Sequence, residues 1–124
     1  MPISVGMRPA EVCARLRERL AGHLRVAGPR VVAVTHTLPF ASQLLRRSSP
    51  TWQFAQAFMG SAPLGEMLRA DPRIELVISG HTHCPSDQAI GQLRAVVSPL
   101  GYRREWPAGG DDVAVRAALS VLDL

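Results

Sequence analysis

The sequence predicts an α/β fold whose sheet is at least partly parallel, and three observations support this class. Two apolar runs rich in β-branched residues, at residues 31–34 and 74–79, lack the alternation of a half-exposed strand. They therefore predict strands that are buried on both faces. A segment with helical periodicity precedes each run, at residues 8–27 and 61–70. This helix–strand–helix–strand order is typical of α/β domains with parallel pairing.

The first helix is expected over residues 8–27. Pro9 suits the first helical position, and Glu11 suits the positive N-terminal end of the helix. Apolar residues recur at helical spacing, namely Cys13, Leu16, Leu20 and Leu24. Gly28 and Pro29 end this helix before the first strand.

A loop and a second helix are expected between the two strands. Residues 41–50 predict an exposed loop with room for one helical turn, and residues 52–60 predict a loop or short helix that contributes packing residues. Ser61 is a suitable cap for the second helix, which Asp71 and Pro72 end.

Two further strands are predicted downstream, at residues 93–97 and 117–124, although residues 113–122 also fit a helix. The chain has no internal repeat, low-complexity segment or linker. Its 124 residues suffice for one compact domain, so residues 1–124 are expected to form a single domain.

The composition is that of a folded protein, with 47% hydrophobic and 19% charged residues. The formal net charge is +4, and every basic residue is an arginine. These arginines are scattered and form no dense basic patch, which disfavours a nucleic-acid partner. Two cysteines fit a reducing compartment. With neither a signal peptide nor an apolar run long enough for a bilayer, the expectation is a cytoplasmic protein without a membrane partner.

Three of the four histidines follow the two predicted apolar strands. His36 comes directly after the first strand, and His81 and His83 come after the second in a Gly-His-Thr-His sequence. In α/β sheets, ligand sites gather beyond the carboxyl ends of neighbouring strands. We therefore expect these three imidazoles to converge, with Gly80 allowing close backbone approach. In an extended His-x-His segment both side chains project to the same side and can bind one ion or one ion each.

Simpler interpretations of the same residues stay open. A histidine at a strand end is commonly a hydrogen-bonded loop residue, and Cys84 is either a soft metal ligand or an incidental thiol. Asp87 is expected to be a solvated loop residue. Four further residues are candidates for lining a phosphate-binding cleft: Arg46, Arg47, Tyr102 and Arg103.

Residues 32–39 and 77–83, which contain these histidines, resemble the last two signature motifs of calcineurin-like metallophosphoesterases. Residues 52–61 and 97–102 are similar to a bacterial branch of that superfamily, so the resemblance covers residues 31–106. It implies half of an α-β-β-α sandwich with a mixed sheet and flanking helices. It also implies that His36 and His81 bind one ion of a dinuclear centre and that His83 binds the other.

Three upstream motifs of that superfamily are absent from residues 1–124: Asp-x-His, Gly-Asp with a second Asp, and Gly-Asn-His. The resemblance thus implies an incomplete site for divalent Mn, Fe or Zn, with no catalytic residue besides the metal ligands. The expected function is a phosphoester hydrolase fragment that supplies the histidine half of the site and is inactive alone. It would act on a phosphate ester once completed by a homo-oligomer or a complementing chain. The alternative is a non-catalytic metal-binding or interaction module, either a truncated remnant or a split subunit.

Overall fold

The computed structural model describes residues 6–45 and 47–124, which divide into two compact units on either side of the Arg30–Val31 bond. The first unit contains helix α1 (Pro9–Val26), which confirms the helix predicted over residues 8–27. The backbone N–H of Arg8 donates to Glu11 Oε2 over 2.8 Å. This bond, together with one from the Arg8 side chain, holds the pKa of the Glu11 carboxyl below its usual value.

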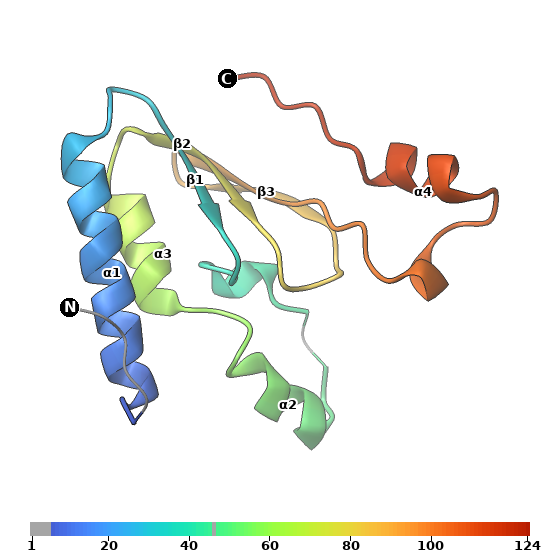
Figure 1. Ribbon diagram of the computed structural model, residues 1–124, viewed down its shortest axis with the longest axis horizontal. Coiled ribbons are helices and arrows are strands. Elements are labelled where there is room, and N and C mark those ends of the chain that lie inside the picture. The colour runs from blue at the N-terminus through green and yellow to red at the C-terminus, as the bar shows by residue number, and fades with distance from the viewer. Residues whose placement is uncertain (1–5, 46) are drawn as a thin grey trace. The chain divides into compact units, whose positions relative to one another are not determined.

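A four-stranded mixed sheet organises the second unit (Figure 1). Its strands are β1 (Val31–Thr35), β2 (Ile74–Ser79), β3 (Ser86–Ile90) and β4 (Leu93–Val97), in the order β1-β2-β4-β3. The β1–β2 and β2–β4 pairs are parallel, whereas β3 and β4 run antiparallel. The α/β class and the partly parallel sheet are therefore confirmed.

Burial differs between the two strands that were predicted to be buried on both faces. In β2, both Leu76 and Val77 are buried although they point to opposite faces, as predicted. In β1, Ala33 is buried, but Val32 is 40% and Val34 is 74% exposed. The prediction that β1 is buried on both faces is wrong. β2 is the only strand that pairs with β1 among the described residues, so β1 is an edge strand; its face at Ala33 is buried, and its face at Val32 and Val34 is exposed.

The helices between β1 and β2 agree with the sequence. A short 3₁₀ turn, η1 (Ala41–Gln43), and helix α2 (Pro50–Gln56) lie in the segment expected to be loop or short helix. Helix α3 (Ala62–Ala70) confirms the second predicted helix. The Ser61 hydroxyl accepts from the backbone N–H of Leu64 over 3.4 Å, which is the predicted N-cap.

The chain downstream of β2 differs most from the predictions. Strand β3 was not predicted because its first residues are polar, and it forms by pairing with β4 across a turn at Gly91, which has φ of +63°. A second 3₁₀ turn, η2 (Arg103–Glu105), precedes helix α4 (Asp111–Ala118). The strand predicted at residues 117–124 is wrong, and the helical alternative holds for its first part. Leu119 and Val121 are 69% and 83% exposed, so no burial stabilises a strand there.

The segment that follows His36 is held by backbone contacts with the start of α3. Leu38, which is 1% exposed, forms a parallel bridge with Gly60. The Leu38 N–H donates to the Met59 carbonyl over 2.9 Å, and the Ser61 N–H donates to the Leu38 carbonyl over 3.0 Å. Gly65 then lies directly against the Pro39 carbonyl, where an added Cβ would overlap that oxygen. These contacts fix the path of the chain on leaving β1.

Among residues 6–45 and 47–124, no helix combines the length and the apolar character that a membrane span requires.

We expect Gly65→Ala to lower the free energy of unfolding by about 1–3 kcal/mol, because its Cβ would displace the Pro39 backbone. The same change at Gly22 in α1, where the nearest atom is a flexible Arg25 nitrogen at 3.5 Å, should instead stabilise the helix by about 0.5–1 kcal/mol. Urea denaturation followed by circular dichroism measures both. Equal effects at the two glycines would contradict the tight contact at Gly65.

Candidate functional site

The parallel register of β1 and β2 brings the two histidine segments together. Thr35 and Ser79, the last residues of the two strands, are register partners. Their hydroxyl oxygens lie 2.9 Å apart, and the Thr35 hydroxyl donates to the Thr37 carbonyl over 2.8 Å. One residue further, the Gly80 N–H donates to the His36 carbonyl over 3.2 Å. The chain leaving β1 at His36 is therefore hydrogen-bonded to the chain leaving β2.

His36 and His81 are in direct contact through their ring nitrogens. His36 Nε2 lies 2.9 Å from His81 Nδ1, and the ring centroids are 4.8 Å apart at an interplanar angle of 76°. Without an ion, one nitrogen must carry a proton and donate to the other. Two nitrogens that each lie about 2.0–2.1 Å from one ion would be roughly 2.9–3.4 Å apart for bond angles between a right angle and a tetrahedral one. The observed 2.9 Å is the length of an ordinary hydrogen bond, and it equals the separation of two ligands of one ion at a bond angle near 90°.

His81 has an unusual backbone conformation. Its φ is +67°, which places it in the left-handed region, and it is the only such non-glycine residue among those described. The Thr82 N–H donates to the Gly80 carbonyl over 2.8 Å, so residues 80–82 form a γ-turn of the rare form with positive φ. Such strain clusters at functional sites, which supports a role for His81.

Two geometric predictions for the segment of residues 80–83 are corrected by the structure. Residues 81–83 are not an extended strand, so alternation does not determine where the His81 and His83 side chains point. Gly80 is also not needed for close approach, because an added Cβ would meet His36 only at ordinary distances of 3.7 Å and 3.9 Å.

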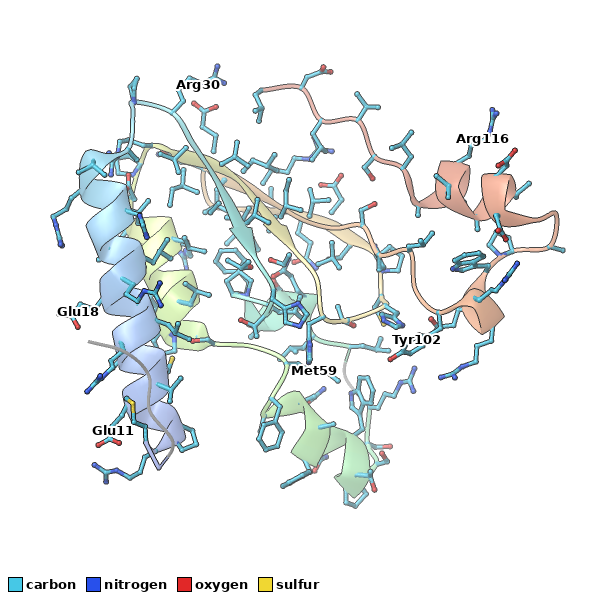
Figure 2. All side chains as sticks on the ribbon, in the orientation of Figure 1. Glu11, Glu18, Arg30, Met59, Tyr102 and Arg116 are labelled. Atoms are coloured by element: carbon cyan, nitrogen blue, oxygen red, sulfur yellow. The ribbon has the colours of Figure 1, made fainter. Side chains whose placement is uncertain are left out.

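His83 has different neighbours. Its Nδ1 lies 2.8 Å from Glu105 Oε2. Its ring packs edge-to-face with the Tyr102 ring, and the two centroids are 4.5 Å apart. Tyr102 extends from the segment after β4 and is labelled in Figure 2. The His83 and Glu105 side chains are 35% and 42% exposed, so this pair is accessible to solvent and to a ligand.

The Glu105 carboxylate also caps the 3₁₀ turn in which it lies. The Tyr102 N–H donates to the same Oε2 over 2.6 Å. That bond lowers the pKa of Glu105, partial desolvation opposes it, and His83 and Arg104 lower the pKa further. The carboxylate is therefore ionised at neutral pH and can only accept, so His83 Nδ1 must be the donor.

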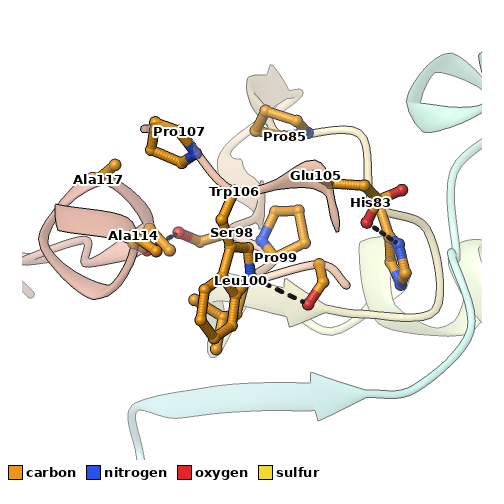
Figure 3. Close-up of a pocket in the computed structure, with 12 residues that line it drawn as sticks. His83, Pro85, Ser98, Pro99, Leu100, Glu105, Trp106, Pro107, Ala114 and Ala117 are labelled. Atoms are coloured by element: carbon orange, nitrogen blue, oxygen red, sulfur yellow. Dashed lines mark hydrogen bonds and ion pairs between the residues drawn. The ribbon is translucent and has the colours of Figure 1, made fainter. Parts of the chain in front are cut away.

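A cavity of about 200 Å³ lies beside this pair (Figure 3). His83 and Glu105 form part of its wall, and most of the remaining lining is apolar, including Trp106, Pro99 and Ala114. The Trp106 Nε1–H donates to the Gly101 carbonyl over 3.4 Å, which satisfies the indole. The cavity thus joins an apolar surface to one of the candidate histidines.

The predicted convergence of three imidazoles is matched for two of them. His36 and His81 are in contact, whereas the described contacts of His83 are with Glu105 and Tyr102. Within residues 6–45 and 47–124, no three His, Cys, Asp or Glu side chains are grouped so that they could hold a metal ion. Cys84 is a half-buried free thiol.

Glu105 is the residue that the sequence did not reveal. A glutamate three residues after the start of a turn is a capping signal, but nothing in the sequence points from residue 105 to His83. Asp87 lies on β3 rather than in a loop, and both its oxygens accept from Arg94, at 2.8 Å and 2.6 Å. It is therefore engaged in a cross-strand ion pair.

The candidate phosphate-binding residues have other partners or fall outside the structure. The Arg47 guanidinium lies 4.7 Å from the centre of the Trp52 ring, and Arg103 pairs with Asp111 over 3.1 Å. Arg46 lies outside the described residues. Tyr102, in contact with His83, is the member of this group that lies at the candidate site.

We expect His81→Gly to change the free energy of unfolding by less than about 1 kcal/mol, because relief of the strain at positive φ offsets the loss of the contact with His36. The matched change His83→Gly should lower it, because His83 does not have positive φ and would lose its bond to Glu105. Thermal and urea unfolding of both variants measure the difference. A loss of stability in His81→Gly as large as in His83→Gly would show that the turn is not strained.

No protein-family model, curated protein or solved structure matches this chain. The basis for assigning a function is therefore the arrangement of side chains at the carboxyl ends of β1 and β2.

Proposed function

We propose that this chain supplies the histidine half of a dinuclear metal site in a phosphoester hydrolase, with His36 and His81 on one divalent ion and His83 on the other. The observation that carries the proposal is the 2.9 Å separation of His36 Nε2 and His81 Nδ1 at the ends of two adjacent parallel strands. The strained turn at His81 and the resemblance of both histidine motifs to calcineurin-like metallophosphoesterases support it.

The donor set suits the ions but does not complete their ligand shells. Imidazole nitrogens bind zinc, iron and manganese, and the two ions of such a pair stabilise the attacking and leaving oxygens of a phosphoryl transfer. Each ion needs at least four ligands, so three histidines leave most positions to other groups. We propose that carboxylates from another polypeptide segment complete the site. This chain's residues hold and orient one side of the ion pair.

The open edge of the sheet is the place where that segment fits. β1 has a strand on one side among the described residues, and it carries the exposed side chains of Val32 and Val34. His36 follows the same strand directly. A second copy or a complementing chain that covered β1 would bury this apolar surface and reach the histidines at the same time.

The cavity beside His83 suits part of an organic phosphate ester. Its volume of about 200 Å³ exceeds the roughly 150 Å³ that accommodates a benzene ring in a protein interior. Its lining is largely apolar, with Trp106 available for contact with a ring. A phosphate ester with a small apolar or aromatic group could therefore place that group in the cavity and its phosphate near His83.

A non-catalytic metal-binding or interaction module is the second candidate. The absence of any three grouped ligands within residues 6–45 and 47–124 favours it, because two imidazoles can hold an ion loosely without supporting turnover. The two candidates share the metal contact at His36 and His81 and differ in whether phosphate ester is hydrolysed.

Isothermal titration with Zn²⁺ should detect binding that His36→Ala and His81→Ala each weaken by at least about tenfold, or 1.4 kcal/mol. His23→Ala, a matched histidine change in α1, should leave binding unchanged.

Hydrolysis of an aryl phosphate in Mn²⁺ is expected to be absent for the chain alone. Hydrolysis that is lost in His81→Ala would instead exclude the non-catalytic candidate. Zn²⁺ binding that does not depend on His36 or His81 would overturn both.

Sedimentation at tens of micromolar should show a dimer or larger assembly, because the apolar edge at β1 favours association. Val34→Lys places a charge at a position that is 74% exposed, so it should shift the chain to monomer without unfolding it. Val115→Lys, at a 51% exposed position on α4, is the matched control and should not. A stable monomer for the unaltered chain would rule out self-association through β1.

A further inference from the structure

We infer that Glu105 is a positioning residue for His83: it accepts the Nδ1 proton and so leaves Nε2 as the nitrogen available to a divalent cation. This inference rests on the proposed function for the identity of the ligand, but the orientation itself is independent of any ion. The 2.8 Å contact between His83 Nδ1 and Glu105 Oε2 is its starting point (Figure 3). A carboxylate behind an imidazole fixes the tautomer and increases the basicity of the other nitrogen.

The carboxylate is itself held in place. Glu105 Oε2 accepts the Tyr102 N–H over 2.6 Å, so its position is set by the backbone of the 3₁₀ turn. Gly101, with φ of +75°, lies so close that a Cβ there would be 2.7 Å from Oε2. A side chain at residue 101 would therefore compete with Glu105 for its position.

The His83 ring is oriented from a second direction. Tyr102 meets it at an interplanar angle of 76°, and the Arg104 guanidinium lies 4.8 Å from the centre of the Tyr102 ring. The segment of residues 101–105 thus contacts His83 through a carboxylate and an aromatic ring. These contacts limit rotation of an imidazole that is otherwise 35% exposed.

His81 and His83 differ in which ring nitrogen is left free to bind a cation. The nitrogen of His81 that meets His36 is Nδ1, whereas Nδ1 of His83 is occupied by Glu105. The two histidines of the Gly-His-Thr-His segment would therefore bind through different ring nitrogens. This difference follows from the γ-turn at His81 and from the carboxylate at His83.

Nitrogen-15 NMR of the imidazole rings tests the orientation in metal-free protein at about pH 8, where free imidazole is neutral. We expect His83 to be in the Nδ1–H form. Glu105→Ala should shift it toward the Nε2–H form that a free histidine side chain favours. Glu105→Gln retains an oxygen that can accept, so it should rescue the Nδ1–H form. Glu66→Gln, an equal loss of charge at an exposed position on α3, is the control.

Zn²⁺ titration of the same variants tests the consequence for the ion. Glu105→Ala should weaken the binding of the ion at His83 by about 10–100-fold and leave the ion at His36 and His81 unaffected, with Glu66→Gln unchanged at both. Loss of the Nδ1–H form in Glu105→Ala without Zn²⁺ binding by any variant would overturn the proposed function and leave the orientation supported. A His83 tautomer that is the same in Glu105→Ala and the unaltered chain, with the fold intact by circular dichroism, would overturn the inference.

Discussion

The parallel register of β1 against β2 is the constraint on which the candidate site depends. It places Thr35 opposite Ser79, and the hydrogen bond from Gly80 to the His36 carbonyl continues the pairing by one residue. Both histidine segments must then leave the sheet at the same end. A shift of the register by one residue would turn every side chain of β1 to the opposite face and remove the contact between His36 and His81.

The parts of the fold that the sequence predicted well are those with strong local signals. Helix α1 follows from its periodicity and Pro9, α3 from the Ser61 cap, and β2 from the apolar residues 76–78. Strand β3 could not be predicted in this way, because its polar residues form a strand only through pairing with β4 and the Asp87–Arg94 ion pair. Such pairing is tertiary information that a local pattern does not contain.

The same limit applies to the site. Strand ends identified His36 and His81 as neighbours, but the strained turn that aims His81 at His36 has no sequence signature beyond a preceding glycine. Glu105 was missed because 22 residues separate it from His83. The orientation of His81 thus depends on a strained backbone turn, and that of His83 depends on its contacts with Glu105 and Tyr102. Neither feature can be inferred from the Gly-His-Thr-His spacing that suggested a common role.

The charge at the proposed metal site is a second reason, besides the number of ligands, to expect a complementing segment. The chain already carries a formal net charge of +4, and two divalent ions would add four positive charges. The carboxylate found at the candidate site, that of Glu105, is bonded to His83 and to the Tyr102 backbone. Binding a second cation beside the first without further anionic ligands would incur strong repulsion. In the proposed dinuclear site, acidic residues supplied along the β1 edge would relieve this repulsion, so a segment that completed the proposed ligand shells would also balance their charge.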